Sequence, residues 1–247
     1  MSIPGIVSVE GGGNTSVLGL SEAVPDLPAN VRAWTTTRHS GSFGLGSGEA
    51  VGEVMARWAA LQEELAQLGV SRLANAHQVH GNVVTVHGGG WRGWLRGRAA
   101  DGHVTARRGT ALAVTVADCT PVLVWHPAGA VAALHAGWRG TAARILDHGL
   151  DSLVALGFPS EECHVWLGPA ICGGCYEVGP EVLTAIHGAP HAAKGQLDVR
   201  AILGEQALAR RVASVRTAAG CARCHTDRYF SHRAGDTGRM LGVIALL

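Results

Sequence analysis

The chain has 247 residues, of which 20 are basic and 19 acidic, so its formal charge is +1, and 47% of its residues are apolar. This length and apolar content are typical of one folded domain and exclude a disordered chain. The balanced charge argues against nucleic acid and anionic membrane surfaces as partners. The one lysine, Lys194, follows no glycine-rich loop, which excludes a P-loop phosphate site.

Residues 1–20 lack the basic head, apolar core and cleavage site of a signal peptide. Apolar runs elsewhere are far shorter than the about 20 residues that span a bilayer. We therefore expect a cytoplasmic protein without a membrane partner. In that compartment the six cysteines are interpreted as ligands, catalysts or core residues rather than as disulfides.

The first half of the chain shows strand and helix periodicity after an irregular segment over residues 1–30, which we expect to precede one domain over 31–247. The elements predicted next are a strand over Val31–Thr37, a glycine- and serine-rich loop, a helix over Ala50–Leu68 ended by Gly69, a strand over Asn75–His87 and a loop over Gly88–Gly97. The helix is the clearest of these, because its apolar residues recur every three or four positions.

The second half carries longer apolar runs. The elements predicted there are a buried strand over Ala111–Trp125 interrupted near Asp118–Pro121, a strand over Ala130–His135, a helix capped by Thr141 and ended by Gly157, a strand over His164–Leu167, a helix over Pro180–Ile186, a helix over Asp198–Ala218, and strands over Tyr229–Phe230 and Leu241–Leu247. Together they predict a single α+β domain with a mixed β-sheet and flanking helices.

Cys119 and His135 lie on the two arms of a predicted hairpin. If the turn places His126 opposite Ala130, Cys119 faces Gly137, and His135 lies two residues away on the same face. A thiolate and an imidazole at that distance can share a Zn²⁺ ion. The alternative, which spacing does not exclude, is a buried cysteine beside a satisfied core histidine.

Charged residues flank this pair. Asp118 interrupts an apolar strand, where a carboxylate needs a partner, and Arg139 follows in a glycine-flanked turn. A thiol, an imidazole, a carboxylate and a guanidinium at one sheet end indicate a functional site. A structural ion pair between Asp118 and Arg139 is the alternative.

Two further histidines offer a third ligand. His77 and His80 point to opposite faces if both lie on a strand, so one of them, but not both, could complete the site. Three protein ligands and an open position are typical of a catalytic zinc site. Spacing does not choose between the two histidines.

Two Cys-x-x-Cys motifs, Cys172 with Cys175 and Cys221 with Cys224, remain outside that site. Four cysteines can hold a structural zinc, but 45 residues separate these pairs, well beyond the usual spacing of about 15–20. Cys221–His225 also matches a c-type haem attachment motif. The interpretation favoured by sequence is that these are packing cysteines, some of them redox-reactive.

The order of short motifs resembles the YfiH family, also called the multicopper polyphenol oxidase (laccase-like) or peptidoglycan editing factor family. The resemblance covers about residues 30–247. It is carried by Thr36-Thr37-Arg38, Gln78-Val79-His80-Gly81, Ala100-Asp101-Gly102, Ala117-Asp118-Cys119, His135-Ala136-Gly137-Trp138-Arg139-Gly140, Gly168-Pro169-Ala170-Ile171, Cys175-Tyr176-Glu177-Val178-Gly179 and Tyr229-Phe230-Ser231-His232-Arg233.

This resemblance implies a catalytic domain over 31–247 that binds one zinc through His80, Cys119 and His135, which selects His80 over His77. It implies phosphorolysis of adenosine, inosine and 5′-methylthioadenosine, deamination of adenosine, and a monomer. We expect catalytic roles for Cys119, Arg38, Asp118 and Arg139, and substrate contacts from Arg38, Arg139 and Tyr176. Paired guanidinium donors suit phosphate.

Other functions within the same resemblance are a copper polyphenol oxidase and an editing factor acting on a cell-wall precursor. The chain has no His-x-His pair, and one His/His/Cys set cannot hold four coppers, so copper is expected only as an adventitious ion. The loop after Arg38 is shorter than in the family, and Arg233-Ala234 replaces an Arg-Arg pair. The resemblance implies that this loop covers the substrate, so its shortening affects substrate specificity.

Overall fold

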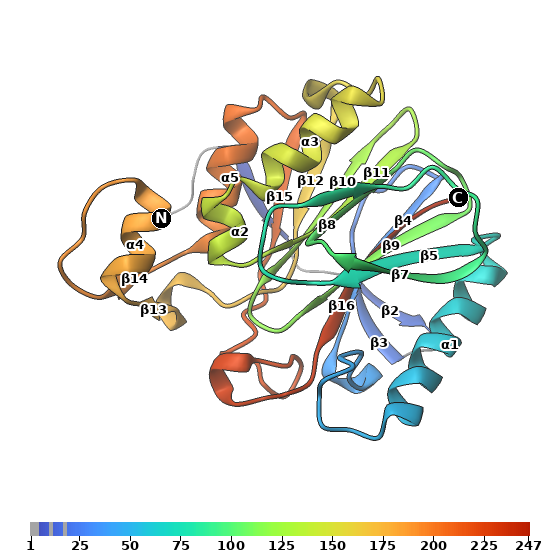
Figure 1. The fold of residues 1–247 in the computed structure, drawn as a ribbon, viewed down its shortest axis with the longest axis horizontal. Helices are drawn as coiled ribbons and strands as arrows, with labels where there is room; N and C mark the ends of the chain where they lie inside the picture. Colours follow the sequence, from blue (N-terminus) through green and yellow to red (C-terminus); the bar gives the residue numbers. More distant parts are fainter. Residues whose placement is uncertain (1–4, 10–11, 17–18) are drawn as a thin grey trace.

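The computed structural model describes residues 5–9, 12–16 and 19–247, which form two stacked β-sheets with helices on both outer faces (Figure 1). One seven-stranded sheet has the order β1 (Ile6–Val9), β15 (Ser214–Ala218), β12 (His164–Leu167), β10 (Thr120–His126), β11 (Ala130–Ala136), β8 (Gly102–Thr105), β6 (Val84–Val86). The other has the order β2 (Gly12–Ser16), β3 (Gly19–Ala23), β4 (Val31–Thr36), β16 (Met240–Leu246), β9 (Thr110–Val116), β5 (Arg72–His77), β7 (Gly93–Ala99).

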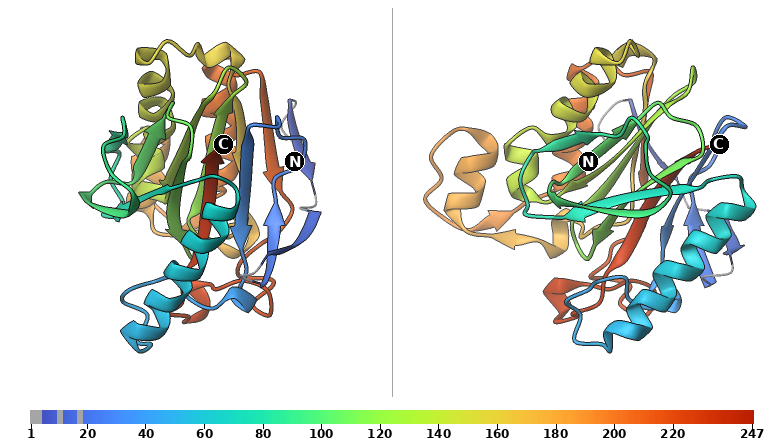
Figure 2. Two further views of the ribbon diagram at one scale, coloured as in Figure 1. Left: turned by 90° about the vertical axis from the view of Figure 1, so that its right-hand side faces the viewer. Right: turned by 45° about the vertical axis from the view of Figure 1, so that its right-hand side comes forward.

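The helices cover the two outer faces of this sandwich. They are α1 (Val51–Gln67), α2 (Trp138–Ala142), α3 (Ile145–Ala155), α4 (Pro180–His187) and α5 (Val199–Ala209). Helices α3 and α5 pack on the first sheet and α1 on the second, as the two rotated views in Figure 2 show. A two-stranded ribbon of β13 (Glu177–Val178) and β14 (Gly195–Gln196) lies beside α4.

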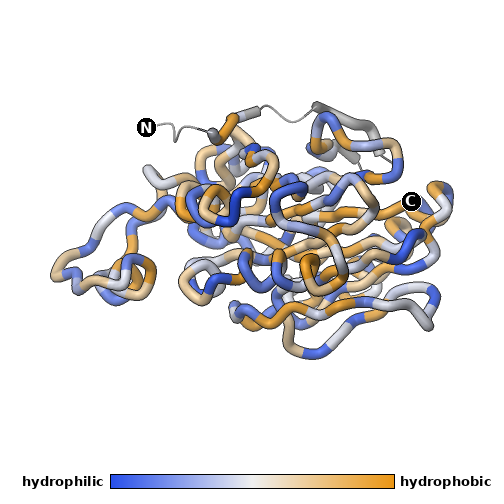
Figure 3. The backbone as a smooth tube through the Cα atoms, turned by 90° about the horizontal axis from the view of Figure 1, so that it is seen from above, coloured by the Kyte–Doolittle hydropathy of each residue, from blue (hydrophilic) through white to orange (hydrophobic). Residues whose placement is uncertain are grey.

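The central strands are buried on both faces, which explains why they read as continuous apolar runs. In β10, Val122 and Val124 face the α3–α5 layer, whereas Leu123 and Trp125 face the second sheet. Figure 3 shows apolar segments concentrated in these strands and polar ones in the peripheral loops. None of the helices in the described ranges is long and apolar enough to cross a membrane.

The structure confirms the α+β class but has two mixed sheets where the sequence predicts one. The predicted strand over Ala111–Trp125 is divided between them, with β9 in one sheet and β10 in the other. The reason is local: Asp118 has a φ of 77°, which turns the chain from one layer to the next. The expected irregular segment 1–30 instead contributes β1, β2 and β3, although residues 1–4, 10–11 and 17–18 lie outside the described part.

Helix ends explain two further differences. The predicted helix over Asp198–Ala218 ends at Ala209, because Arg211 adopts a left-handed φ of 56° and β15 follows. Thr141 does not cap a helix: Gly137 precedes α2, and Arg144, with a φ of 61°, separates α2 from α3. The helix ended by Gly69, whose φ is 78°, is confirmed as α1.

Two strand predictions and one loop prediction also change. The stretch 75–87 holds the end of β5, a loop and β6, and the second half of the predicted loop over Gly88–Gly97 is the start of β7. Tyr229–Phe230 is not a strand. Tyr229 is instead buried, and its phenol donates a hydrogen bond to Glu22. The chain thus reaches β16 through a loop over 219–239, with one 3₁₀ turn at His232–Ala234.

Candidate active site

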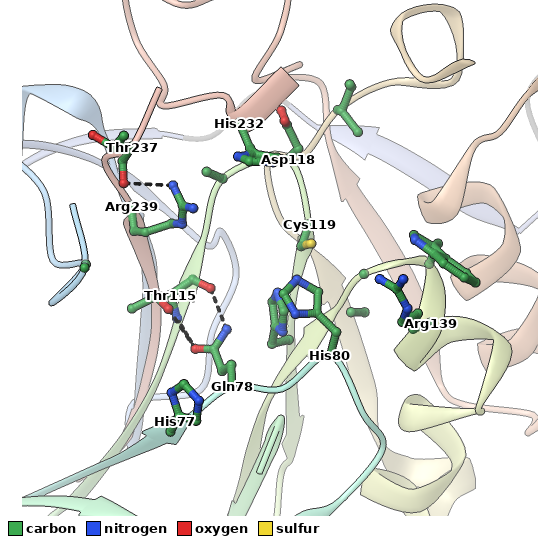
Figure 4. A pocket seen from close by; sticks show the side chains of 18 of the residues that line it. His77, Gln78, His80, Thr115, Asp118, Cys119, Arg139, His232, Thr237 and Arg239 are labelled. Carbon is green, nitrogen blue, oxygen red and sulfur yellow. Dashed lines mark hydrogen bonds between the residues drawn. The ribbon is translucent and has the colours of Figure 1, made fainter. Parts of the chain in front are cut away.

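A cavity of about 600 Å³ opens at the end of the sandwich where β9 and β11 finish and β10 and β16 begin (Figure 4). Its walls come from loops far apart in the sequence. They include the segments 44–47, 76–80, 117–119, 135–139, 171–176 and 232–239. The site therefore draws on both sheets.

The predicted hairpin register is confirmed. His126 lies opposite Ala130 and Pro121 opposite His135, so Cys119 directly precedes the last pair of the ladder. His135 points to the same face of β11 as Val131 and Ala133, which pack against the second sheet. Its ring therefore lies on the inner face, at the open end of the sandwich.

Three potential metal ligands meet at this point. One ligand atom each of His80, Cys119 and His135 lies within 4.8 Å of the other two, and the two imidazole rings are 4.8 Å apart at 77°. His77 lines the same cavity but is not part of this cluster. The geometry therefore places His80, not His77, beside the pair on the hairpin, although His80 lies in a loop and not on the expected strand.

Asp101 holds the cluster together, and the sequence reasoning assigned it no role. Its fully buried carboxylate accepts a hydrogen bond from His135 Nδ1 at 2.8 Å. It also accepts the backbone amides of Val79, His80 and Gly81 at 3.1, 2.9 and 2.8 Å. One side chain thus orients His135 and holds the loop that presents His80. The feature of the sequence that could have pointed to Asp101 is a carboxylate between two small residues, Ala100 and Gly102.

The backbone must pass close to these ligands. A Cβ atom on Gly137 would lie 2.9 Å from Cys119 Sγ and 3.3 Å from His80 Cδ2, so only glycine fits there. His80 itself adopts a left-handed φ of 60°. That conformation is held by the Asp101 contacts, which offset its cost.

The electrostatics favour a cation. Burial raises the pKa of Cys119, but His135 and His80 outweigh it and bring the pKa to about 6. Burial lowers the pKa of His135, but Cys119 and Asp101 raise it to about 9. At neutral pH the pair is a thiolate with an imidazolium, and a divalent ion can replace the imidazolium proton.

The donor set fits a zinc-type ion. Metal–ligand bonds of about 2.0–2.3 Å place tetrahedral ligand atoms about 3.4–3.8 Å apart, which is compatible with a cluster whose ligand atoms all lie within 4.8 Å of one another. Asp101 on His135 Nδ1 leaves Nε2 to face the ion. Three protein ligands leave one position open, as in catalytic sites.

Arg139, Tyr176 and Asp118, for which catalytic or substrate-binding roles are expected, also line the cavity. The Arg139 guanidinium lies 4.4 Å over the Trp138 ring and forms no ion pair with any described residue, so the alternative of a structural ion pair with Asp118 is wrong. Asp118 instead accepts hydrogen bonds from Ser231 Oγ at 2.7 Å and from the Arg233 amide at 2.6 Å. Both its oxygens are thereby committed to the loop over 219–239.

Arg38 does not line the cavity, in contrast to the expected contact with substrate. Its guanidinium pairs with Asp236 at 2.5 Å, donates to the Tyr229 carbonyl at 3.2 Å and lies 4.5 Å over the Phe230 ring. These partners are about 190 residues away in sequence, so no local sequence pattern could predict the contacts. Arg38 holds the loop over 219–239, whose His232, Arg233, Thr237 and Arg239 form one wall of the cavity.

Several cavity residues were assigned no catalytic or binding role from the sequence. Arg96, Arg233 and Arg239 add positive charge, and Arg239 lies across the cavity from Arg139 (Figure 4). Gln78 donates to the Thr115 carbonyl at 2.8 Å and accepts the Thr115 amide at 2.7 Å, which ties the His80 loop to β9. The pocket is therefore a cationic cavity next to a potential metal site.

The fold and this site define a single-domain α+β protein with one His/Cys cluster at the mouth of a sandwich. Residues 32–247 match the family described as multi-copper polyphenol oxidoreductase laccase, and the chain belongs to this family. That finding confirms the resemblance to YfiH proteins. The structure is similar to a YfiH protein from Bacillus licheniformis, with a TM-score of 0.79 and 25% identity over 88% of this chain and 93% of that one.

Two relatives carry names that state an activity. A purine nucleoside phosphorylase from Streptomyces griseus is 36% identical over 213 residues, covering 82% of this chain and 87% of the relative. An adenosine deaminase from an unknown prokaryote is 35% identical over 147 residues, which covers 54% of this chain and 56% of the relative. Relatives of this chain are thus enzymes of purine nucleosides.

Proposed function

We propose that this protein is a zinc-dependent purine nucleoside phosphorylase whose metal ligands are His80, Cys119 and His135. The observation that carries the proposal is the position of this His/Cys cluster in the wall of a cationic cavity of about 600 Å³. The name of the Streptomyces griseus relative supports the substrate class. A cavity of this volume suits a nucleoside with phosphate beside it.

Phosphate binding is assigned to Arg139. Its guanidinium is exposed, faces the cavity and has no carboxylate partner among the described residues, so it is free to take two phosphate oxygens. Arg96, Arg233 and Arg239 add to the positive potential that draws a dianion into the cavity.

The nucleoside is assigned to the Tyr176 side. Burial, and then the Cys119 thiolate, raise the pKa of Tyr176, so its phenol keeps its proton at neutral pH and can donate it in a hydrogen bond. The Arg233 guanidinium lies 4.9 Å over the Tyr176 ring, which fixes the ring at the cavity wall. An aromatic wall next to a donor suits a purine base.

In phosphorolysis a phosphate oxygen bonds to the anomeric carbon, and the bond from that carbon to the purine nitrogen breaks. The electron pair leaves with the purine, which takes up the proton that the attacking hydrogen phosphate gives up. Zinc would supply a fixed divalent charge that acts as a Lewis acid. The chain's own part is to hold phosphate on Arg139, donate a hydrogen bond from Tyr176 and exclude water with the 44–47 and 232–239 walls. Asp118 and Arg38 are positioning residues in this scheme, because each acts through the loop over 219–239.

Adenosine deamination is the second candidate activity. The open position left by three ligands is the observation that favours it, together with the name of the deaminase relative. Both reactions would use the same cavity.

Purine release tests the assignment. Purified protein with assayed zinc is incubated with adenosine or inosine, with and without phosphate, and bases are separated by chromatography. We expect phosphate-dependent adenine or hypoxanthine, abolished by Cys119→Ala and retained by Cys163→Ala, a buried cysteine outside the site. Zinc-loaded protein that releases no base contradicts the phosphorylase. Formation of inosine from adenosine would then indicate a deaminase, and oxygen uptake with a phenol would indicate an oxidase. If neither is observed, a cell-wall precursor is the substrate to test next.

A further inference from the structure

The two Cys-x-x-Cys motifs, far apart in sequence, converge in space. The sulfurs of Cys172, Cys175, Cys221 and Cys224 all lie within 4.8 Å of one another. The first pair lies in the loop after β12 and the second in the loop after β15, and β12 and β15 are parallel neighbours whose loops leave the same sheet edge. Adjacent parallel strands thus bring together motifs whose separation argued against a shared ion.

Backbone contacts join the two loops at the cysteines. Ala170 and Cys221 form a parallel bridge, and the Ala222 amide donates to the Ala170 carbonyl at 3.0 Å. The amides of Cys172 and Cys224 both donate to Cys221 Sγ, at 3.3 and 3.4 Å. Amide donors aimed at a sulfur stabilise its thiolate, which is the form that binds metal.

The first motif makes a tight turn held by its own backbone. The Cys175 amide donates to the Cys172 carbonyl at 3.0 Å, within the 3₁₀ turn Gly173–Cys175. This turn directs both of its sulfurs to one side. The two motifs together bring four sulfurs into one cluster, within 4.8 Å of one another.

We propose that Cys172, Cys175, Cys221 and Cys224 bind one structural Zn²⁺, separate from the ion assigned to His80, Cys119 and His135. Zinc–sulfur bonds of about 2.3 Å place four tetrahedral sulfurs about 3.8 Å apart, which fits a cluster confined within 4.8 Å. A cluster of several irons holds its cysteines on different atoms and spreads them further. Four protein ligands leave no open position, so this ion has a structural role.

A disulfide fits the same residues less well. Cys175 Sγ and Cys224 Sγ are 3.4 Å apart, against about 2.05 Å in a disulfide. Disulfides also join sulfurs only in pairs, whereas here every sulfur lies near the other three. All six cysteines of the chain are free thiols in the structure.

The site would connect two walls of the cavity. Ile171 and Tyr176 flank the first motif, and the loop carrying the second leads to His232 and Arg233. Cross-linking the loops at their base restricts the motion of both walls. Cys221 is buried and Cys224 exposed, so the ion would lie at the surface, within reach of a chelator.

Metal content tests the proposal. Protein purified under reducing conditions is measured by plasma mass spectrometry, with the natural chain compared with Cys175→Ser/Cys224→Ser, Cys119→Ala and Cys163→Ala. We expect two zinc ions per chain in the natural protein and in Cys163→Ala, and one in each of the other two variants. Cobalt substitution gives a readout independent of activity: the strong thiolate-to-cobalt absorption should fall far more in the double serine variant than in Cys119→Ala.

Two results would overturn the proposal. The first is one zinc per chain that Cys119→Ala removes and Cys175→Ser/Cys224→Ser keeps. The second is an intact-mass deficit showing that the four cysteines form disulfides under the same conditions. Neither result contradicts the catalytic ion, and the first would assign the single zinc to Cys119. Conversely, a chain that binds zinc at the four cysteines but lacks zinc at Cys119 would contradict only the phosphorylase assignment.

Discussion

Asp101 and His135 are joined twice: the Asp101 carboxylate accepts from His135 Nδ1 at 2.8 Å, and the Asp101 carbonyl accepts the His135 amide at 2.7 Å. The side-chain bond sets the tautomer and ring direction of a proposed metal ligand. The backbone bond fixes the strand end that carries it. The buried carboxylate keeps its charge, because the hydrogen bonds it accepts lower its pKa against the effect of burial.

Asp101→Asn should weaken zinc binding about 10- to 100-fold. One Asp101 oxygen accepts hydrogen bonds from Val79 and Gly81, and the other accepts from His80 and His135. The asparagine NH₂ group would replace one of these oxygens and, as a donor, could accept neither of its hydrogen bonds. Competition with a chromogenic chelator measures the affinity. Asp151→Asn, an exposed carboxylate on α3, is the matched control. Equal zinc affinity in Asp101→Asn and the natural protein would contradict the assigned role.

Gly137→Ala should empty the metal site while the fold survives. The added methyl group would lie 2.9 Å from Cys119 Sγ, too close for the thiolate to keep its position. Zinc content and circular dichroism check the two halves of this expectation. Gly52→Ala, in α1 with nothing within 4 Å of the new methyl, should keep its zinc and gain up to about 1 kcal/mol of stability.

Arg139→Gln should raise the KM for phosphate about 10- to 100-fold, which corresponds to losing one charge-assisted hydrogen-bond pair. Initial rates at varied phosphate and saturating nucleoside measure it. Arg144→Gln, at the residue between α2 and α3 that pairs with Asp147 outside the cavity, should leave the KM unchanged. An unaltered phosphate KM in Arg139→Gln would move the phosphate site to another cavity arginine.

Arg38→Gln should lower kcat/KM about tenfold by loosening the loop over 219–239. If Arg38 acts through Asp236, the double variant with Asp236→Asn should lose no more than either single variant does. If the losses in kcat/KM of the two single variants multiply in the double variant, Arg38 acts independently of Asp236, and direct contact with the substrate is indicated instead. The cycle needs only steady-state kinetics.

The same ion pair should appear in the pH dependence of stability. The Arg38 hydrogen bond holds the pKa of Asp236 below its ordinary value near 3.8, so unfolding raises that pKa. The stabilisation is present above the unfolded value and is lost as pH falls through the folded one. Between pH 4 and pH 2 the free energy of unfolding should fall more steeply in the natural protein than in Asp236→Asn. Parallel curves from denaturant titrations would show that the pair adds no stability.

Local signals in the sequence predicted much of this molecule. The turn after His126 set the register that aligns Pro121 with His135, because a short connection leaves a hairpin few ways to pair. Apolar periodicity gave α1, and a left-handed glycine marked its end. Motif order identified the family. Each of these depends on residues that are near one another in the chain.

The tertiary structure alone decided the rest. His80 meets His135 only because Asp101 folds its loop, Arg38 finds Asp236 across 198 residues, and the two cysteine pairs meet because β12 and β15 are neighbours. The sequence also could not show that β9 and β10 belong to different sheets, because both strands are apolar on both faces and together resemble one long strand. Contacts between distant segments leave no periodic trace in sequence. These contacts depend on how the buried surfaces of the sheets and helices pack together, and that packing is determined only when the whole chain folds.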